Sequence, residues 1–334
     1  MLAIYPRSAF DVYNKIKINY PSNIDAICEE IYKACTGMGT DEEMLIKILG
    51  PRSPNDRALI SYRYKELFNT PLRDLVKGET SGDLGFLMQL ICMSLPQAEA
   101  YIIHRACKGA GTSEHLLYPI LVGRSDAEMN VLKKTYFEMY EEDLAVMLNA
   151  ELSGDFHQII MLALQELQIE YKSSFHTKEK VEEDAEMLYK AGEGKWGTDE
   201  GTFVKTLFSC PPQHLENVNK AYTEKHGHDI INAIQSEFGG TATDALVYFV
   251  RLTLEPFKLL TERLEASMAG LGTDEMALSS FLVRYHPYLS KIKPIFEDKH
   301  KISLRERIHG DTEGRHRELL LHVVDAPSSE GAFA

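Results

Sequence analysis

The chain has 334 residues, with 36 Lys plus Arg against 50 Asp plus Glu, and a formal net charge of −14. A chain this acidic is repelled by nucleic-acid backbones and by bare anionic membranes, because direct phosphate binding needs a clustered basic surface. With 44% hydrophobic and 26% charged residues, the composition excludes a disordered, collagen-like or coiled-coil chain and fits either two globular domains or an array of smaller units.

The apolar stretches are too short to span a bilayer. The longest, such as 159–164 and 245–250, fall far short of the roughly 18 residues that a membrane-spanning helix needs. Proline and charged residues within the first twenty positions leave no room for the apolar core of a secretory leader. The cysteines form no Cys-x-x-Cys pair, so we expect reduced, buried thiols in a cytoplasmic protein. They are Cys28, Cys35, Cys92, Cys107 and Cys210.

A short glycine phrase occurs four times along the chain. It reads Gly37-Met38-Gly39-Thr40, Gly109-Ala110-Gly111-Thr112, Lys195-Trp196-Gly197-Thr198 and Gly270-Leu271-Gly272-Thr273. The second glycines of successive phrases are 72, 86 and 75 residues apart. Self-similarity at this spacing predicts four similar structural units.

An acidic residue follows each glycine phrase at a nearly constant distance. Glu79, Glu151 and Glu237 lie 40 residues after the second glycine of their unit, and Asp311 lies 39 residues after it. Taken alone, each glycine could end a helix and each acid could begin one. The shared offset in four divergent units instead indicates that loop and carboxylate act together.

The sequence between these phrases has helical spacing. In the first unit Ile24, Ile27 and Ile31 mark one apolar face, and Asn23 precedes them as a helix cap. We expect Thr40 to cap the helix after the first glycine phrase. Strict alternation is absent and breakers fall at helix-like intervals. The pattern predicts an all-α fold with five helices per unit, one before the glycine loop, three between the two loops and one after.

The glycine phrase does not match the loops that bind nucleotides. It lacks the third glycine and preceding strand of a dinucleotide fingerprint, and the Gly-Lys-Ser/Thr ending of a P-loop. A tight glycine loop can instead turn successive carbonyls outward. About three carbonyls and one carboxylate supply about five of the 6–8 oxygens that Ca²⁺ takes, so one to three positions stay open. A single carboxylate leaves a local excess of about +1, which favours phosphate at those positions and predicts weak affinity without it.

The pattern resembles the annexin family. Repeats of about seventy residues, each with a Gly-x-Gly-Thr loop and a later acid, are that family's signature, and the resemblance extends from about Ile24 to Asp325. Repeat details resemble a protist or other non-vertebrate member. The resemblance implies a curved, right-handed superhelical disc whose convex face carries the calcium loops towards acidic phospholipid. The expected parts are an N-terminal tail at 1–20, repeats at 21–93, 94–167, 168–254 and 255–325, and a C-terminal tail at 326–334.

The resemblance also implies the calcium ligands, which are carbonyls from the residue two before the first glycine position (three before it in the third repeat) and from both glycine positions, with the distal carboxylate. They are Cys35, Gly37, Gly39 and Glu79; Cys107, Gly109, Gly111 and Glu151; Gly192, Lys195, Gly197 and Glu237; and Met268, Gly270, Gly272 and Asp311. The cysteines would act through their carbonyls. Expected membrane contacts at the loop tips are Met38, Lys108, Trp196 and Leu271.

The third and fourth repeats depart from the family pattern in the turn that follows the acid. Phe238-Gly239-Gly240 follows the acid of the third repeat where the family has x-Ser/Thr-Gly-Asp, so the sequence does not define that turn. In the fourth repeat Glu313 and Arg315 replace the usual Ser and Asp. We rank sites one and two first, then four, then three. Arginines recur after three of the glycine loops, and the resemblance suggests buried ion pairs between helices for Arg52, Arg124 and Arg284.

We predict reversible, calcium-dependent binding to acidic phospholipid at the inner face of membranes. The protein is expected to be a monomer that can assemble laterally on membranes, with no nucleic-acid partner. The alternative is a cytoskeletal or structural scaffold with the same fold. An enzyme is not favoured because no nucleophile and base form a recognisable motif. A zinc site at His226 and His228 is not favoured because ligand spacing is absent.

Overall fold

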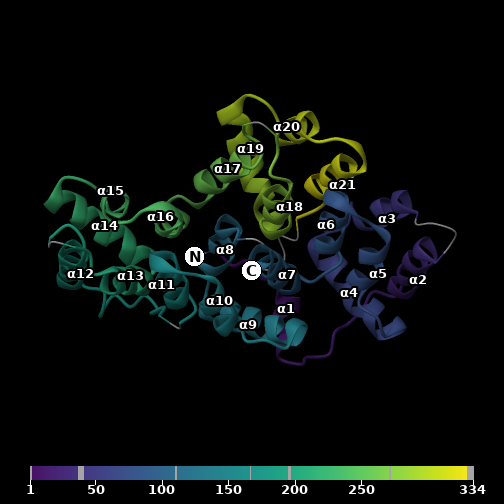
Figure 1. Ribbon diagram of the computed structural model, residues 1–334, viewed down its shortest axis with the longest axis horizontal. Coiled ribbons are helices and arrows are strands. Elements are labelled where there is room, and N and C mark those ends of the chain that lie inside the picture. Colours follow the sequence, from purple (N-terminus) through teal and green to yellow (C-terminus); the bar gives the residue numbers. More distant parts are fainter. Residues whose placement is uncertain are drawn as a thin grey trace. The chain divides into compact units, whose positions relative to one another are not determined.

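The computed structural model describes residues 2–36, 41–109, 111–165, 167–194, 197–270 and 272–328. Within these ranges the chain forms twenty-one α-helices and one short 3-10 helix, with no strand (Figure 1). The all-α prediction is therefore confirmed. None of the helices in these ranges is long and apolar enough to cross a membrane.

Each repeat contains five α-helices, as predicted. The first has α2 (Ile24–Cys35), α3 (Glu42–Leu49), α4 (Pro54–Phe68), α5 (Leu72–Glu79) and α6 (Gly82–Ile91). The second has α7 (Leu95–Cys107), α8 (Glu114–Leu121), α9 (Asp126–Tyr140), α10 (Leu144–Glu151) and α11 (Gly154–Ala163). The third has α12 (Lys178–Ala191), α13 (Glu200–Ser209), α14 (Pro212–His226), α15 (Ile230–Glu237) and α16 (Gly240–Leu254). The fourth has α17 (Pro256–Ala266), α18 (Glu275–Arg284), the 3-10 helix η1 (His286–Tyr288), α19 (Leu289–His300), α20 (Leu304–Asp311) and α21 (Gly314–Asp325).

A further helix, α1 (Arg7–Tyr13), lies within the segment expected as an N-terminal tail. The residues around its start are buried, with Ile4 3% and Tyr5 1% exposed. The Tyr5 hydroxyl donates a hydrogen bond to the Glu99 carboxylate at 2.5 Å. These long-range contacts hold the segment, which is why local sequence pattern did not reveal the helix.

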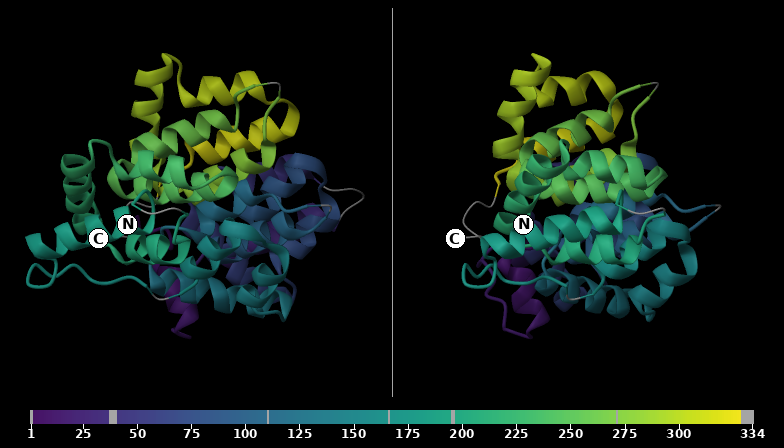
Figure 2. Two further views of the ribbon diagram at one scale, coloured as in Figure 1. Left: turned by 60° about the vertical axis from the view of Figure 1, so that its left-hand side comes forward. Right: turned by 90° about the vertical axis from the view of Figure 1, so that its left-hand side faces the viewer.

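The helices form two compact units that do not follow chain order. Residues 103–259, with 1–3, form one, here called the second–third unit; residues 4–102 and 260–334 form the other, the first–fourth unit. In the second–third unit α11 packs against α13 and α16. In the first–fourth unit α6 packs against α18 and α21, which brings the blue and yellow ribbons of Figure 1 side by side. Figure 2 shows the same neighbours from two further directions.

Helix α6 shows why the first and fourth repeats associate. Every residue from Gly85 to Ile91 is buried, and a helix that is apolar all round needs neighbours on every side. Its own repeat supplies only some of them, because α18 and α21 of the fourth repeat also pack against it.

Arg284, one of the three recurring arginines, forms the expected ion pair between helices. Arg284 of α18 pairs with Glu99 of α7, and their side chains are 5% and 0% exposed. Arg124 lies 3.8 Å from Glu128, four residues later. Arg52 donates from Nε to the carbonyl of Ile48 at 2.7 Å.

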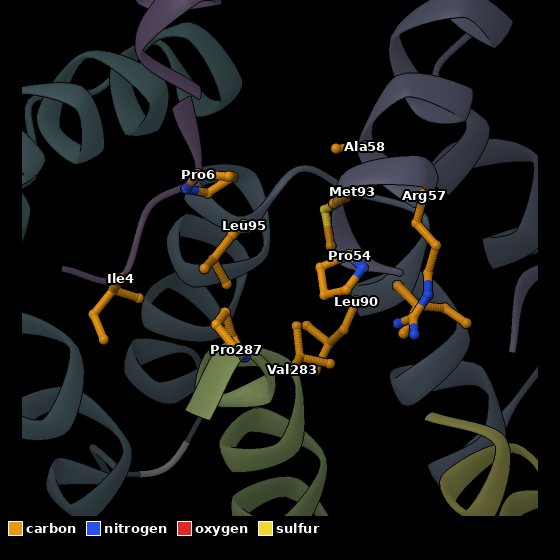
Figure 3. Close-up of a pocket in the computed structure, with 11 residues that line it drawn as sticks. Ile4, Pro6, Pro54, Arg57, Ala58, Leu90, Met93, Leu95, Val283 and Pro287 are labelled. Atoms are coloured by element: carbon orange, nitrogen blue, oxygen red, sulfur yellow. The ribbon is translucent and has the colours of Figure 1, made fainter. Parts of the chain in front are cut away.

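A small apolar pocket lies in the first–fourth unit. Figure 3 shows Ile4 and Pro6 of the N-terminal segment, Pro54 and Leu90 of the first repeat, and Val283 of the fourth repeat around it. Its volume is about 30 Å³, which is room for about one water molecule. The pocket is too small for a substrate.

Candidate metal centres

The same backbone hydrogen bond closes all four glycine phrases. The N–H of the residue after the threonine donates to the carbonyl that precedes the first predicted ligand, at 2.6–3.0 Å. The four donor–acceptor pairs are Asp41 to Ala34, Ser113 to Ala106, Asp199 to Ala191, and Asp274 to Ser267. The predicted first ligands therefore occupy equivalent places at or just after the end of a helix. They are Cys35, Cys107, Gly192 and Met268.

The described loop glycines have the backbone conformation that the sequence predicted. Gly109 and Gly111 have φ of +123° and +100°, Gly270 and Gly272 have +105° and +95°, and Gly197 has +80°. L-residues with a Cβ rarely adopt these angles, whereas glycine does so without strain. The loops thus depend on glycine for their shape.

Part of the predicted site falls outside the described residues. The predicted ligands there are Gly37, Gly39 and Lys195, and the predicted membrane contacts there are Met38, Trp196 and Leu271. These assignments stay predictions. Lys108, the fourth predicted membrane contact, is exposed immediately after α7.

The distal acids are the last residues of four eight-residue helices, α5, α10, α15 and α20. In the third repeat the Thr198 hydroxyl donates to the Glu237 carboxylate at 2.6 Å. In the fourth the Thr273 hydroxyl donates to the Asp311 carboxylate at 2.7 Å. In both repeats the acid therefore meets its own glycine loop, although about forty residues separate them in sequence.

In the first two repeats the acids act on the cysteines that start the loops. Burial, and after it the carboxylate of Glu79, raises the pKa of the Cys35 thiol to about 11. Burial and the carboxylate of Glu151 raise the pKa of Cys107 to about 12. An electrostatic effect of this kind requires the groups to lie near each other. Both thiols stay protonated at neutral pH, which agrees with the prediction that these cysteines would act through their carbonyls.

The threonine of the phrase is not the helix cap, contrary to the prediction for Thr40. The cap of α3 is Asp41, which accepts a hydrogen bond from the N–H of Met44 at 2.9 Å. Asp199 and Asp274 cap α13 and α18 in the same way. The aspartate one residue later is the N-cap because its carboxylate reaches the free N–H groups of the first turn. In the last two repeats this leaves the threonine hydroxyl to the distal carboxylate.

The second turn has one shape in all four repeats. Its glycine has φ between +57° and +62° at Gly82, Gly154, Gly240 and Gly314. The residue before it is extended in each case. The turn after Glu237, which the sequence did not define, therefore keeps the common geometry because Gly240 occupies the left-handed position.

The donor chemistry fits a hard cation in the first three repeats. Carbonyl groups and one carboxylate per repeat are oxygen ligands, which Ca²⁺ prefers. The fourth repeat differs, because Arg307 donates from Nη1 to Asp311 at 2.6 Å and from Nη2 to the Met268 carbonyl at 2.5 Å. Sequence reasoning missed this arginine. A comparison of the four repeats at the position four residues before the acid would have found it.

Among the described residues, one group of three side chains has metal-ligand chemistry away from the glycine loops. It comprises Asp184, Cys210 and His214, all buried. Asp184 already accepts from Lys180 Nζ at 2.9 Å and contacts His214 Nε2 at 2.8 Å. The lysine ammonium supplies the positive charge that a metal would bring, so we assign this cluster a structural role.

The two histidines considered for zinc lie near the third loop. His228 Nε2 lies 2.8 Å from the Glu193 carboxylate, and the Tyr222 hydroxyl donates to the same group at 2.7 Å. The ring of His226 stacks on Tyr189 at a centroid distance of 3.9 Å. Glu193 follows the predicted ligand Gly192, so these contacts position the start of the loop.

An ion pair joins the first and fourth repeats, and the pseudo-symmetric positions carry two acids. Arg315 of the fourth repeat pairs with Glu42 of the first at 2.6 Å. The reciprocal positions are Asp83 and Glu275, both acidic. Burial, followed by the carboxylates of Asp83, Asp311 and Asp274, raises the pKa of Glu275 to about 7.

This raised pKa predicts pH-dependent stability. The folded state binds the Glu275 proton more tightly than the unfolded chain does. The contribution of this group to the free energy of unfolding is therefore fully present below pH ~4.5 and is lost as pH rises through about 7. His316 lies 3.4 Å away, but burial lowers its pKa, so it offers no charge at neutral pH. We expect the melting temperature to fall between pH 5 and 7.5, and Glu275→Gln to flatten that fall. An unchanged pH profile in Glu275→Gln would contradict the assignment.

The fold and the loops define an all-helical protein of four repeats, each pairing a glycine loop with a distal carboxylate. The family model described as Annexin matches residues 26–91, 98–163, 183–248 and 261–323. The chain belongs to the annexin family, which is known for calcium-dependent phospholipid binding. Each matched range falls within one predicted repeat, and the boundaries themselves stay a prediction.

Curated relatives come from several lineages. The chain is 32% identical to annexin C1 of Cryptococcus neoformans over 92% of this chain and 66% of that protein. It is 35% identical to annexin A7 of Dictyostelium discoideum over 89% of this chain and 64% of that protein. It is 33% identical to human annexin A3 over 91% and 94%. The chain thus spans slightly less than two thirds of the fungal and Dictyostelium proteins.

Solved structures agree with the fold. Annexin III superposes with a TM-score of 0.84 at 32% identity, over 92% of this chain and 96% of that one. Chicken annexin V, solved in complex with Zn²⁺, gives 0.79 at 34% identity, over 93% and 98%. Calcium-bound annexin (Sm)1 gives 0.74 at 26% identity, over 91% and 92%.

Proposed function

We propose that this chain binds acidic phospholipid membranes reversibly through calcium ions held by its glycine loops. The observation that carries the proposal is the approach of each distal carboxylate to its own loop. Hydrogen bonds make that contact in the third and fourth repeats, and electrostatic effects on the loop cysteines indicate it in the first two.

The second repeat gives the fullest account of the chemistry. The carbonyls of Cys107, Gly109 and Gly111 and the carboxylate of Glu151 would hold the ion, which is short of the 6–8 oxygens that Ca²⁺ takes. A phosphate oxygen fills an open position and meets a local excess of about +1. The exposed side chain of Lys108 lies beside the loop and would add attraction to the headgroups. Calcium thereby makes the local charge at the loop positive, although the net charge of the chain is −14.

The remaining parts of the proposal follow from this mode of binding. Met38, Trp196 and Leu271 enter the membrane interface, where amphipathic and apolar side chains are favoured. The protein acts in the cytoplasm as a peripheral membrane protein without catalytic turnover. It is a monomer in solution.

Vesicle sedimentation tests the proposal. The chain is expected to pellet with phosphatidylserine vesicles at roughly millimolar calcium, to be released by chelator, and to stay in solution with phosphatidylcholine vesicles. Pelleting that chelator does not reverse would overturn the calcium mechanism. Sedimentation with cytoskeletal filaments in chelator, without calcium-dependent pelleting, would favour the scaffold alternative.

A further inference from the structure

The fourth repeat contains a cation of its own among the predicted calcium ligands. Arg307 donates to Oδ1 of Asp311 at 2.6 Å and to the carbonyl of Met268 at 2.5 Å. The other carboxylate oxygen of Asp311 accepts from the Thr273 hydroxyl at 2.7 Å. Two of the four predicted ligand residues are therefore already hydrogen-bonded to a guanidinium. Charge-assisted hydrogen bonds of this kind are about twice as strong as neutral ones.

The other repeats have no basic residue at this position. Four residues before the acid they carry Leu75, Met147 and Ala233. None of these side chains can donate a hydrogen bond. The arginine is thus a feature of the fourth repeat and not of the fold.

A second change accompanies the arginine. Glu265, three residues before Met268, accepts from Arg307 at 3.1–3.2 Å. The equivalent residues of the other repeats are aromatic and stack on a second ring, at centroid distances of 3.8–4.8 Å. These stacked pairs are Tyr32 with Phe68, His104 with Tyr140, and Tyr189 with His226. The fourth repeat has therefore exchanged a neutral environment for an ionic network that holds the arginine in place.

The network is largely shielded from water. The side chains of Arg307, Glu265 and Asp311 are only 22–23% exposed, so their attraction is screened less than that of a surface pair. A calcium ion at this loop would have to displace the guanidinium from Asp311 and Met268. If the guanidinium stayed nearby, its positive charge would repel the ion.

We propose that Arg307 is a built-in cation that closes the fourth loop to calcium. The first three repeats then carry the calcium-dependent membrane binding of this chain, and the fourth loop is held in shape without an ion. This inference depends on the proposed function for its biological meaning. Its chemistry, competition between a guanidinium and Ca²⁺ for the same oxygens, can be measured without lipid.

The test isolates the fourth loop in the full-length chain. Glu79→Gln, Glu151→Gln and Glu237→Gln together leave Asp311 as the only distal carboxylate. With Arg307 present, ~10 mM calcium chloride is expected to leave the melting temperature unchanged. Adding Arg307→Met is expected to create a calcium-dependent rise of about 2 °C at a calcium concentration about tenfold above its Kd. Adding Asp311→Asn should abolish that rise.

The reverse exchange provides an independent arm. Leu75 is half-buried at the equivalent position of the first repeat. In a chain that keeps only Glu79, with Gln at the second and third acids and Asn at Asp311, Leu75→Arg should remove the calcium-dependent rise. Leu75→Met, the matched control, should retain it. If Arg307→Met alone does not fold, Glu265→Tyr is added to it. The double variant then has an aromatic residue and an apolar residue at these two positions, as the first repeat does with Tyr32 and Leu75.

Two results would overturn the inference. One is an equal calcium-dependent rise with and without Arg307, and the other is no rise in the folded Arg307→Met chain. Failure of the proposed function is a separate result, because it is measured on the unaltered chain as loss of calcium-dependent pelleting with phosphatidylserine vesicles.

Discussion

Exchanging both Glu79 and Glu151 for Gln is expected to raise the calcium concentration for half-maximal pelleting with phosphatidylserine vesicles by about tenfold or more. Each exchange removes the carboxylate from a loop whose other donors are neutral carbonyls. The ion then loses its only anionic protein ligand there, and calcium affinity depends strongly on the number of charged ligands. If Arg307 closes the fourth loop to calcium, the third repeat would be the only one left with a complete set of predicted calcium ligands.

The matched control makes the same change in net charge at two positions outside the glycine loops and their acids. Glu138 and Glu216 are exposed, at 62% and 57% of their side chains, on α9 and α14. Glu138→Gln with Glu216→Gln should leave the calcium dependence within about twofold, since exposed charges at a distance are largely screened. Glu237→Gln, which alters one loop, should give a smaller shift than the Glu79 and Glu151 pair. Equal effects of the loop pair and the control pair would show that general charge, and not ion ligation, governs binding.

Glu99→Ala is expected to lower the free energy of unfolding by roughly 3–5 kcal/mol. The side chain of Glu99 is fully buried, and it pairs with Arg284, whose side chain is 5% exposed. The Tyr5 hydroxyl also donates to this carboxylate. Removing the carboxylate leaves a buried guanidinium without this anionic partner and removes the hydrogen bond that the Tyr5 hydroxyl donates to it. Urea unfolding measures the effect.

Two further variants separate the buried charge from simple loss of an ion pair. Asp298→Ala breaks an exposed pair with Lys301, with side chains 89% and 76% exposed, and should change stability by less than about 1 kcal/mol. Glu99→Leu combined with Arg284→Leu should recover part of the loss, because no charge then remains buried alone. A Glu99→Ala chain as stable as the parent would show that water or another group compensates the arginine.

Local rules account for the parts of this protein that sequence predicted. The five helices of each repeat follow from apolar spacing and from breakers between helices. The positive φ angles of Gly109, Gly111 and Gly197 follow from the conformational freedom of glycine. The offset between Gly111 and Glu151 predicted that a loop and an acid act together, and Glu151 affects the pKa of Cys107, which begins that loop. Fourfold repetition strengthened each weak local signal.

Long-range packing decided the rest. Helix α1 forms where Ile4 and Tyr5 become buried, and its sequence alone did not indicate this. The association of the first repeat with the fourth depends on neighbours around α6 that are about 200 residues away in sequence. The Thr40 cap prediction was wrong because an aspartate one residue later reaches the helix N–H groups better, as it does in α13 and α18.

The sequence by itself determined the repeats and their helical class, and it predicted the residues that would hold a cation, because these depend on local periodicity and on the chemistry of single residues. Only the tertiary structure decided which of those residues meet another charge. Arg307 reaches the Met268 carbonyl across 39 residues of chain, and burial, followed by the carboxylate of Asp83, raises the pKa of Glu275. Electrostatic interactions depend on distance in space and on burial, and folding sets both.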